Sequence, residues 1–267
     1  MRAIWSGAIS FGLVNIPVKV YSATNSQKMD FDMLDKNDLS PIRYARISTG
    51  SDKEIPYEDI VKGYKWGDQY IVMEKEDFEK ASPEKTKTIE IVDFVDESEV
   101  DSILYDKPYY LEPDKTAARA YALLREALKK SKKVGIATFV FRNKEHIGVV
   151  KTSGKVIVLN QIRFADEIRN PEELNLPGTQ TTKEKELEMA LALIDQSTSN
   201  FDLKKYKDEY SKVLMNIIEK KAKGKPIRSP KGKAPKTTDT SELMNMLKAS
   251  LKKHKAQRQS QSKEAKK

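Results

Sequence analysis

The chain has 267 residues, of which 38% are hydrophobic and 33% are charged, with a formal net charge of +9 and no cysteine. This length allows one large or two modest domains with a real core. The absence of cysteine excludes a disulfide framework and any metal site built from thiolates. Because no run of 18 apolar residues occurs and Met1-Arg2 lead directly into strand-like sequence, we expect a soluble, cytoplasmic protein without a signal peptide or membrane span.

The positive charge is concentrated at the C-terminal end. Residues 221–267 contain 15 lysines and arginines against 3 acids, a net charge of +12, whereas the remaining 220 residues contain 34 against 37, a net charge of −3. A basic tail on a near-neutral body is typical of proteins that bind a polyanion. The same composition also suits a tail that only solubilises the protein.

The stretch 2–24 is the most apolar part of the chain. From Ile16 onward, apolar residues alternate with others at period two, which predicts a strand with one buried face. Before Gly12 the alternation has the opposite phase. We therefore predict one bent core strand with a β-bulge at Leu13-Val14, because bulges bend strands as closure of a barrel requires.

Residues 29–70 combine basic and aromatic side chains. A strand is expected at 31–34, followed by strand-like runs around two turn signals, at 48–52 and at Gly67-Asp68. A basic and aromatic hairpin can hold a phosphate backbone, although an ordinary exposed hairpin fits the pattern equally well. The candidate DNA-contacting residues here are Arg43, Arg46, Lys53, Lys62 and Lys65, interleaved with Tyr44, Tyr57, Tyr64 and Trp66.

The middle of the chain alternates strands and helices. Strands are predicted at 88–95 and 105–113 and in two regions between 134 and 170, with turns at 142–144 and 153–154. Helices are predicted at 75–81 and at 114–133, the second capped by Asp114 and stopped by Gly135.

Two groups of polar residues in this region are expected to have structural roles. The acids Asp96, Glu97, Glu99 and Asp101 lack a nearby histidine and a calcium-loop pattern, so we assign them to a helix N-terminus rather than to a metal. His146 has no sequence-apparent catalytic partner and is interpreted as a structural residue.

The C-terminal part is predicted to be helical and then flexible. Residues 171–182 have the composition of a linker, and helices are predicted at 183–196 and 201–223. Residues 224–238 contain three prolines and form a flexible basic linker. Residues 239–267 are predicted to form a short amphipathic helix and a basic disordered tail. Further candidate DNA-contacting residues are Lys225, Arg228, Lys231, Lys233, Lys236, Lys252 and Lys253.

Several long motifs resemble one family. W-S-G-x-I-S-F-G-L-V-N-I-P-V-K-V-Y at the start, K-E-I-P-Y-E-D-I-V-K-G-Y, D-K-x-Y-Y-L-x-P and I-R-F-A-D-E-I-R are similar to segments of the prokaryotic Ku family, the DNA-end-binding proteins of bacterial non-homologous end joining. The resemblance covers residues 2–223. It implies a mostly β protein with helices (α+β), built from a Ku-type β-barrel, a bridge at about 29–70 and a helical arm at about 183–223. Two copies of the chain are expected to form a ring-shaped dimer.

The resemblance also implies partners and a mode of action. DNA is expected to enter the ring by its end, to be bound by shape and phosphate rather than by sequence, and to be joined by an ATP-dependent DNA ligase D. The protein would be nucleoid-associated. The last helix is a candidate contact for the ligase, through Leu243, Met246, Leu247 and Leu251, and packing of that helix back on the body fits its pattern equally well.

No catalytic residue, cofactor or metal is predicted. Many relatives hold a cysteine pair in a zinc-ribbon-like bridge, but this chain has Ile47 to Ser51 at that place. Two alternatives stay open: an abasic-site lyase acting through a lysine, and a nucleoid architectural or RNA-binding protein acting through its tail alone. A hydrolase, kinase or dehydrogenase is disfavoured, because no P-loop, G-x-G-x-x-G or G-x-S-x-G motif occurs.

Overall fold

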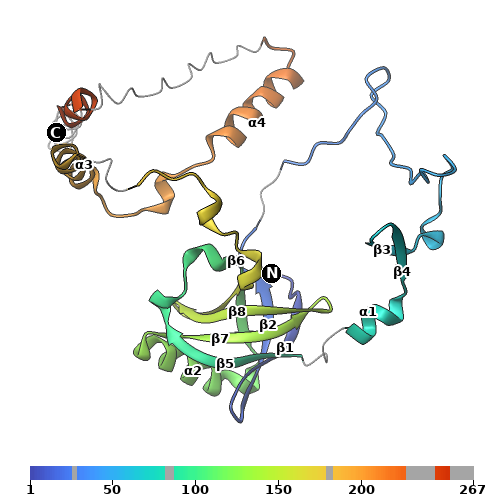
Figure 1. Cartoon of the computed structure of the whole chain (residues 1–267), viewed down its shortest axis with the longest axis horizontal. Helices are drawn as coiled ribbons and strands as arrows, with labels where there is room; N and C mark the ends of the chain where they lie inside the picture. The colour runs from blue at the N-terminus through green and yellow to red at the C-terminus, as the bar shows by residue number, and fades with distance from the viewer. Residues whose placement is uncertain (26–28, 82–86, 179–182, 227–243, 253–267) are drawn as a thin grey trace. The chain divides into compact units, whose positions relative to one another are not determined.

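A computed structural model describes residues 1–25, 29–81, 87–178, 183–226 and 244–252. The chain divides into two compact units, Met1–Asn170 and Pro171–Lys267. The first unit contains a closed barrel of strands in the order β1-β2-β6-β9-β8-β7-β5 (Figure 1). The strands are β1 Trp5–Phe11, β2 Val14–Ser22, β5 Thr88–Asp96, β6 Tyr105–Pro113, β7 Lys133–Phe141, β8 Lys144–Ser153 and β9 Val156–Ile162. The predicted mostly β fold with helices is therefore confirmed.

The apolar stretch at the start of the chain forms a hairpin, so the prediction of one bent strand was wrong. β1 and β2 pair antiparallel from Trp5↔Val20 to Phe11↔Val14, which leaves a two-residue loop. Gly12, the first loop residue, has φ +57°, the left-handed conformation that type II′ hairpin turns place at this position. The change of phase in the sequence is thus the change of strand.

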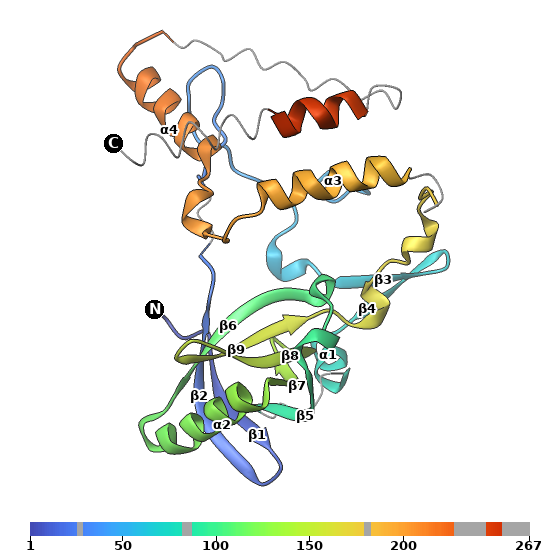
Figure 2. The same ribbon diagram turned by 90° about the vertical axis from the view of Figure 1, so that its left-hand side faces the viewer.

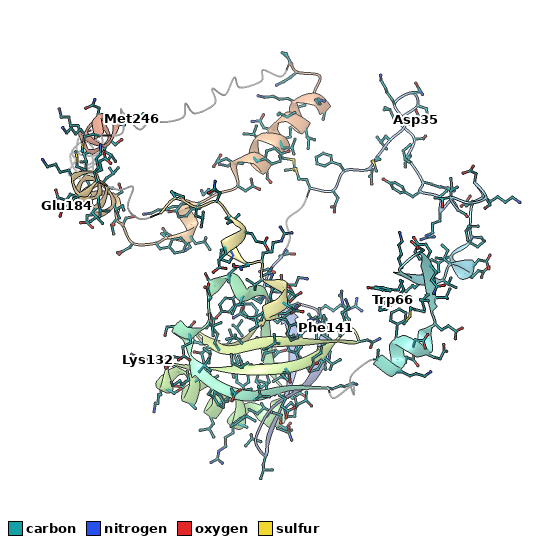
Figure 3. The ribbon with its side chains drawn as sticks, viewed as in Figure 1. Asp35, Trp66, Lys132, Phe141, Glu184 and Met246 are labelled. Carbon is teal, nitrogen blue, oxygen red and sulfur yellow. The ribbon has the colours of Figure 1, made fainter. Side chains whose placement is uncertain are left out.

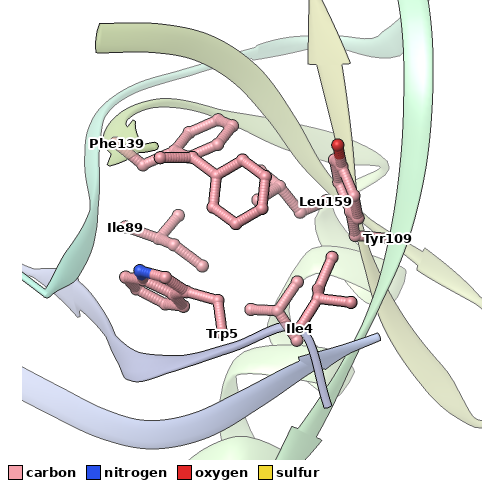
Figure 4. A pocket seen from close by; sticks show the side chains of 8 residues that line it. Ile4, Trp5, Ile89, Tyr109, Phe139 and Leu159 are labelled. Atoms are coloured by element: carbon pink, nitrogen blue, oxygen red, sulfur yellow. The ribbon is translucent and has the colours of Figure 1, made fainter. Parts of the chain in front are cut away.

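Alternating residues of the strands fill the barrel. Ile9, Ile16, Ile89, Leu111 and Ile157 are all fully buried in one cluster. Close to Trp5, aromatic and aliphatic side chains surround a small apolar pocket (Figure 4) with a void of about 10 Å³. Such a void is at the lower limit for one water molecule, so the barrel interior is a packed core rather than a ligand cavity.

Helix α2, Ala118–Ser131, lies against the barrel (Figure 2). Its buried side chains Tyr121, Leu124 and Leu128 belong to the same cluster as the barrel interior. The helix is preceded by a 3₁₀ turn, Lys115–Ala117. The predicted helix over 114–133 is confirmed in position, although it is shorter at its start.

The predicted boundary residues of this helix were wrong. Asp114 makes no side-chain capping bond, and the residue at the N-cap of α2 is Ala117. The helix ends at Lys132, which adopts φ +57°, whereas Gly135 lies inside β7. A Cβ on Gly135 would lie 2.9 Å from Cγ2 of Ile91. Gly135 therefore permits close packing of strands and does not stop the helix.

The acidic cluster after β5 lies beside lysines. Asp96 pairs with Lys133 at 2.8 Å and Glu97 with Lys151 at 2.7 Å. The acids lie at the N-terminal ends of two short 3₁₀ helices, Glu97–Glu99 and Ser102–Leu104, and Asp101 caps the second by accepting a hydrogen bond from the Ile103 N–H. Across the described ranges, no group of three or more His, Asp or Glu side chains is arranged to hold a metal ion.

The segment between β2 and β5 contains the hairpin β3, Lys62–Trp66, and β4, Gln69–Met73, followed by α1, Lys75–Ala81. A 3₁₀ turn, Tyr57–Asp59, precedes β3. β3 and β4 form a separate two-stranded sheet. The turn predicted at Gly67-Asp68 joins them, and Gly67 has φ +61° as such a tight turn requires.

The second unit contains α3, Glu184–Ser197, and α4, Glu209–Ala222, and residues 244–252 are also helical. The helix predicted over 201–223 begins later, because Asp208 caps α4 by accepting a hydrogen bond from the Ser211 N–H at 3.0 Å. The Ser211 hydroxyl also donates to the Asp208 carboxylate, and this bond, followed by the bond from the Ser211 N–H, lowers the pKa of Asp208. Further 3₁₀ turns are Ala165–Glu167, Pro171–Glu173 and Leu203–Lys205. No helix in the described part of the chain is long and apolar enough to span a membrane.

Candidate nucleic-acid interface

The segment 29–70, called the bridge below, is built from three successive turns of chain. The first two turns are closed by two isolated antiparallel residue pairs, Leu34↔Pro41 and Ile47↔Glu54, in place of the strand predicted at 31–34. In the second, the Ile55 N–H donates to the Arg46 carbonyl at 2.7 Å. The third is the β3–β4 hairpin. The bridge is thus held by backbone hydrogen bonds at its turns.

The bridge has no core of its own. Between residues 29 and 81, all of which the structure describes, no side chain is buried. Trp66, labelled in Figure 3, is 68% exposed, and Tyr70 is 72% exposed. An isolated two-stranded hairpin is marginally stable in water at best. The bridge therefore leaves large aromatic side chains exposed to solvent.

The five candidate cations of the bridge do not share one face. In the β3–β4 register, Lys62 lies on the same face as Tyr64 and Trp66, while Lys65 lies opposite Tyr70 on the other face. The structure does bring two cations onto rings: Arg46 Cζ is 5.1 Å from the centroid of Tyr57, and Lys62 Nζ is 4.9 Å from that of Phe78.

The bridge cations are not committed to acids. Arg43, Arg46, Lys53, Lys62 and Lys65 form no ion pair with any described residue. The bridge as a whole nevertheless contains nine acids against six bases, a net charge of −3. Its cations can therefore act as separate point contacts to phosphates, with planar aromatic side chains between them, but not through a broad positive field.

The candidates in the tail are only partly described. Lys225 and Lys252 are exposed. In the helical residues 244–252, Met246 is 45% exposed, and Leu247 and Leu251 are partly exposed. The remaining candidates lie outside the described residues: Arg228, Lys231, Lys233, Lys236, Leu243 and Lys253.

His146 has a structural environment. Its ring stacks on Phe139 with centroids 5.4 Å apart, and its Nε2 lies 3.3 Å from the carbonyl oxygen of Phe141. Both partners lie on the adjacent strand β7, so the ring braces the β7–β8 hairpin. This agrees with its interpretation as a structural residue.

Comparison with known proteins identifies the family. The chain matches the family described as Ku70/Ku80 beta-barrel domain over residues 10–189. It is 41% identical over 256 residues to the non-homologous end joining protein Ku of Opitutus terrae, covering 94% of this chain and 91% of that protein. It is 40% identical over 255 residues to the protein of the same name from Archaeoglobus fulgidus, covering 94% and 98%. The chain, with its closed barrel and its insertion between β2 and β5, therefore belongs to the Ku family.

Proposed function

We propose that this protein binds the ends of double-stranded DNA without sequence preference and acts in repair of double-strand breaks by non-homologous end joining. The family membership and the names of its relatives as non-homologous end joining proteins support this function. The proposed active form is a ring-shaped homodimer that receives DNA by its end, protects the ends and bridges them. The protein would work in the cytoplasm on the nucleoid.

The observation that carries the proposal is the bridge without a core. A segment of this length with exposed aromatic side chains on both faces of its hairpin gains little stability alone. A second copy of the chain can cover the apolar side chains, while the unpaired cations stay available for phosphates. Such binding depends on shape and charge, because phosphate contacts carry no sequence information.

The proposed DNA contacts are the bridge cations Arg43, Arg46, Lys53, Lys62 and Lys65, together with the basic tail. The two sets differ in kind. A ring holds DNA topologically once the end has entered, whereas a basic tail binds any duplex and weakens steeply with salt. Binding that requires a DNA end therefore reports on the bridge cations, and binding that requires no end reports on the tail.

The deciding experiment compares linear duplex, duplex with both ends capped by hairpins, and closed circular duplex in a gel shift across salt, with sedimentation for the dimer. We expect linear DNA to stay bound, once threaded, at salt concentrations that release circles. Hairpin caps at both ends should reduce binding of the duplex to the level of the circles. Equal retention of linear and circular DNA at every salt concentration would overturn end threading.

We further propose that the protein recruits an ATP-dependent DNA ligase D, and that the segment containing Leu243, Met246, Leu247 and Leu251 takes part. The test is stimulation of ligation by the full chain and by a chain lacking 239–267. Stimulation that survives this deletion, at equal DNA occupancy, places the ligase contact elsewhere. No catalytic step is part of the proposal, and borohydride trapping on abasic DNA tests the lyase alternative.

A further inference from the structure

The strongest local concentration of positive charge in the barrel unit lies on α2 and its flanks. Residues 114–133 contain seven lysines and arginines against two acids, a net charge of +5. This contrasts with the net charge of −3 over residues 1–220 and of −3 over the bridge. The body is near neutral only on average, because a cationic helix is balanced by acids elsewhere.

The cations of α2 gather on its outward side. At 100° per residue, Arg119, Leu123 and Lys130 fall on one side of α2, opposite its buried side chains, and Lys115 lies in the 3₁₀ turn directly before the helix. Lys115, Arg119 and Lys130 are exposed, as are Lys129 and Lys132 near the C-terminal end of the helix. Lys132 lies at the outside of the barrel unit (Figure 3). These five cations are called the α2 stripe below.

The cations of the α2 stripe are unpaired within the described residues, whereas the neighbouring cations are engaged. Arg125 donates to the carbonyl of Lys155 at 3.1 Å and pairs with Glu126 at 3.0 Å. Lys133 pairs with Asp96, the last residue of β5, and Lys151 pairs with Glu97, the residue after it. The two acids of residues 114–133 are engaged as well: Glu126 pairs with Arg125, and Asp114 lies 3.9 Å from Nζ of Lys19.

Helix stability does not account for the stripe. Cations favour the C-terminal end of a helix, where Lys129 and Lys130 lie, but they oppose the dipole at the N-terminal end. Lys115 and Arg119 lie at that N-terminal end, where α2 has no acid in its first turn and no side-chain cap. Cations at both ends, one pair against the dipole, indicate that the positive surface serves a ligand.

We propose that the α2 stripe is a second binding surface for the phosphate backbone of duplex DNA, used without any need for an end. Arg119 and Lys130 are eleven residues apart, about 17 Å along the helix axis, a length over which duplex DNA presents about ten phosphate charges. The inference takes from the proposed function only that DNA is the polyanion. It does not depend on threading, on the bridge or on dimerisation.

The test uses the full chain with Arg119→Gln, Lys129→Gln and Lys130→Gln combined, and closed circular duplex as the probe between 50 and 200 mM salt. Removing three phosphate contacts should make the slope of log K against log salt shallower by about 2.7. The matched control is the combined Lys204→Gln, Lys205→Gln and Lys207→Gln variant, which loses the same charge from exposed residues of the other unit. The control should keep the wild-type slope.

An unchanged slope in the α2 variant, or an equal change in the control, would overturn the proposal. A variant that binds circles normally but loses binding to a poly-glutamate peptide would instead assign the stripe to an acidic protein. The preference for linear over circular DNA is measured in the same experiment on the wild-type chain. If that preference is absent, the end-binding function fails, while the slope difference still decides the α2 proposal.

Discussion

The hydroxyl of Tyr121 accepts a hydrogen bond from the backbone N–H of Ile157 at 2.7 Å and donates one to the carbonyl of Leu111 at 2.7 Å. Leu111 and Ile157 are partners at the end of the β6–β9 ladder. One buried side chain of α2 thus completes the hydrogen bonding of two strands, which fixes the helix on the barrel.

Tyr121→Phe should destabilise the protein by roughly 2 kcal/mol or more, because it leaves a buried N–H and a buried carbonyl unpaired, each at about 1–3 kcal/mol. Urea unfolding followed by circular dichroism measures the loss. Tyr110→Phe is the control, since Tyr110 lies on the adjacent position of β6 and makes no side-chain hydrogen bond with a described residue. Equal small losses in both variants would contradict the assigned role.

The alkaline stability of the barrel should depend on Tyr109. Burial is the main cause that raises the pKa of Tyr109 above its ordinary value of 10.0. A pKa that is higher in the folded state gives stability that is complete below pH 10 and is lost as the pH rises through the folded-state pKa. We expect the urea midpoint to be lower at pH 11 than at pH 8, with the fall beginning near pH 10, and we expect a smaller fall in Tyr109→Phe. A steeper alkaline fall in that variant would contradict the direction of this pKa shift.

Charge reversal at the two ends of α2 should change stability in opposite directions. Arg119→Glu should stabilise the helix and Lys130→Glu should destabilise it, each by about 0.3–1 kcal/mol at low salt, because of the helix dipole. Both effects should shrink in 1 M salt. Thermal unfolding at two salt concentrations checks this. If Arg119→Glu were destabilising, a contact of Arg119 would stabilise the helix, and the stripe would no longer imply a ligand.

Truncation after Lys223 should lower DNA affinity but keep the preference for ends. It removes 13 lysines and arginines with three acids, a net charge of +10, so the salt dependence of binding should become shallower. Removal of 254–267 alone takes away a net charge of +4 and should give an intermediate slope. Loss of the preference for linear over circular DNA on truncation would show that the tail, and not the bridge, recognises ends.

Much of the barrel could be predicted from sequence, because strands with one buried face carry a period-two pattern. The hairpin at Gly12-Leu13 could not, since a bulge and a tight turn both shift the phase of that pattern by one residue. Gly135 was misassigned for a related reason. A glycine near the end of a helix resembles a stop, and only the position of Ile91 on the neighbouring strand shows why a side chain is excluded.

The candidate site was harder to predict than the fold. Lys62 and Lys65 look like neighbours in the sequence, but strand alternation places them on opposite faces of the hairpin. The spacing of these two lysines predicts opposite faces once the strand is known. The contacts of the bridge cations with DNA stay predictions. The cations of α2 were missed because the charge was summed over a long body. Counting charge by element, and asking whether it suits the helix dipole at Arg119, could have found them.

The pairing of β1 with β5 has a consequence for the size of the insertion between them. Ile9 and Ile89 are partners in this parallel pair, although the whole bridge separates them in the chain. The entropy of closing such a loop grows only with the logarithm of its length, so doubling the loop costs about 0.6 kcal/mol. The barrel can therefore host a longer or shorter bridge at almost the same stability, so the length of this insertion can change while the barrel is kept.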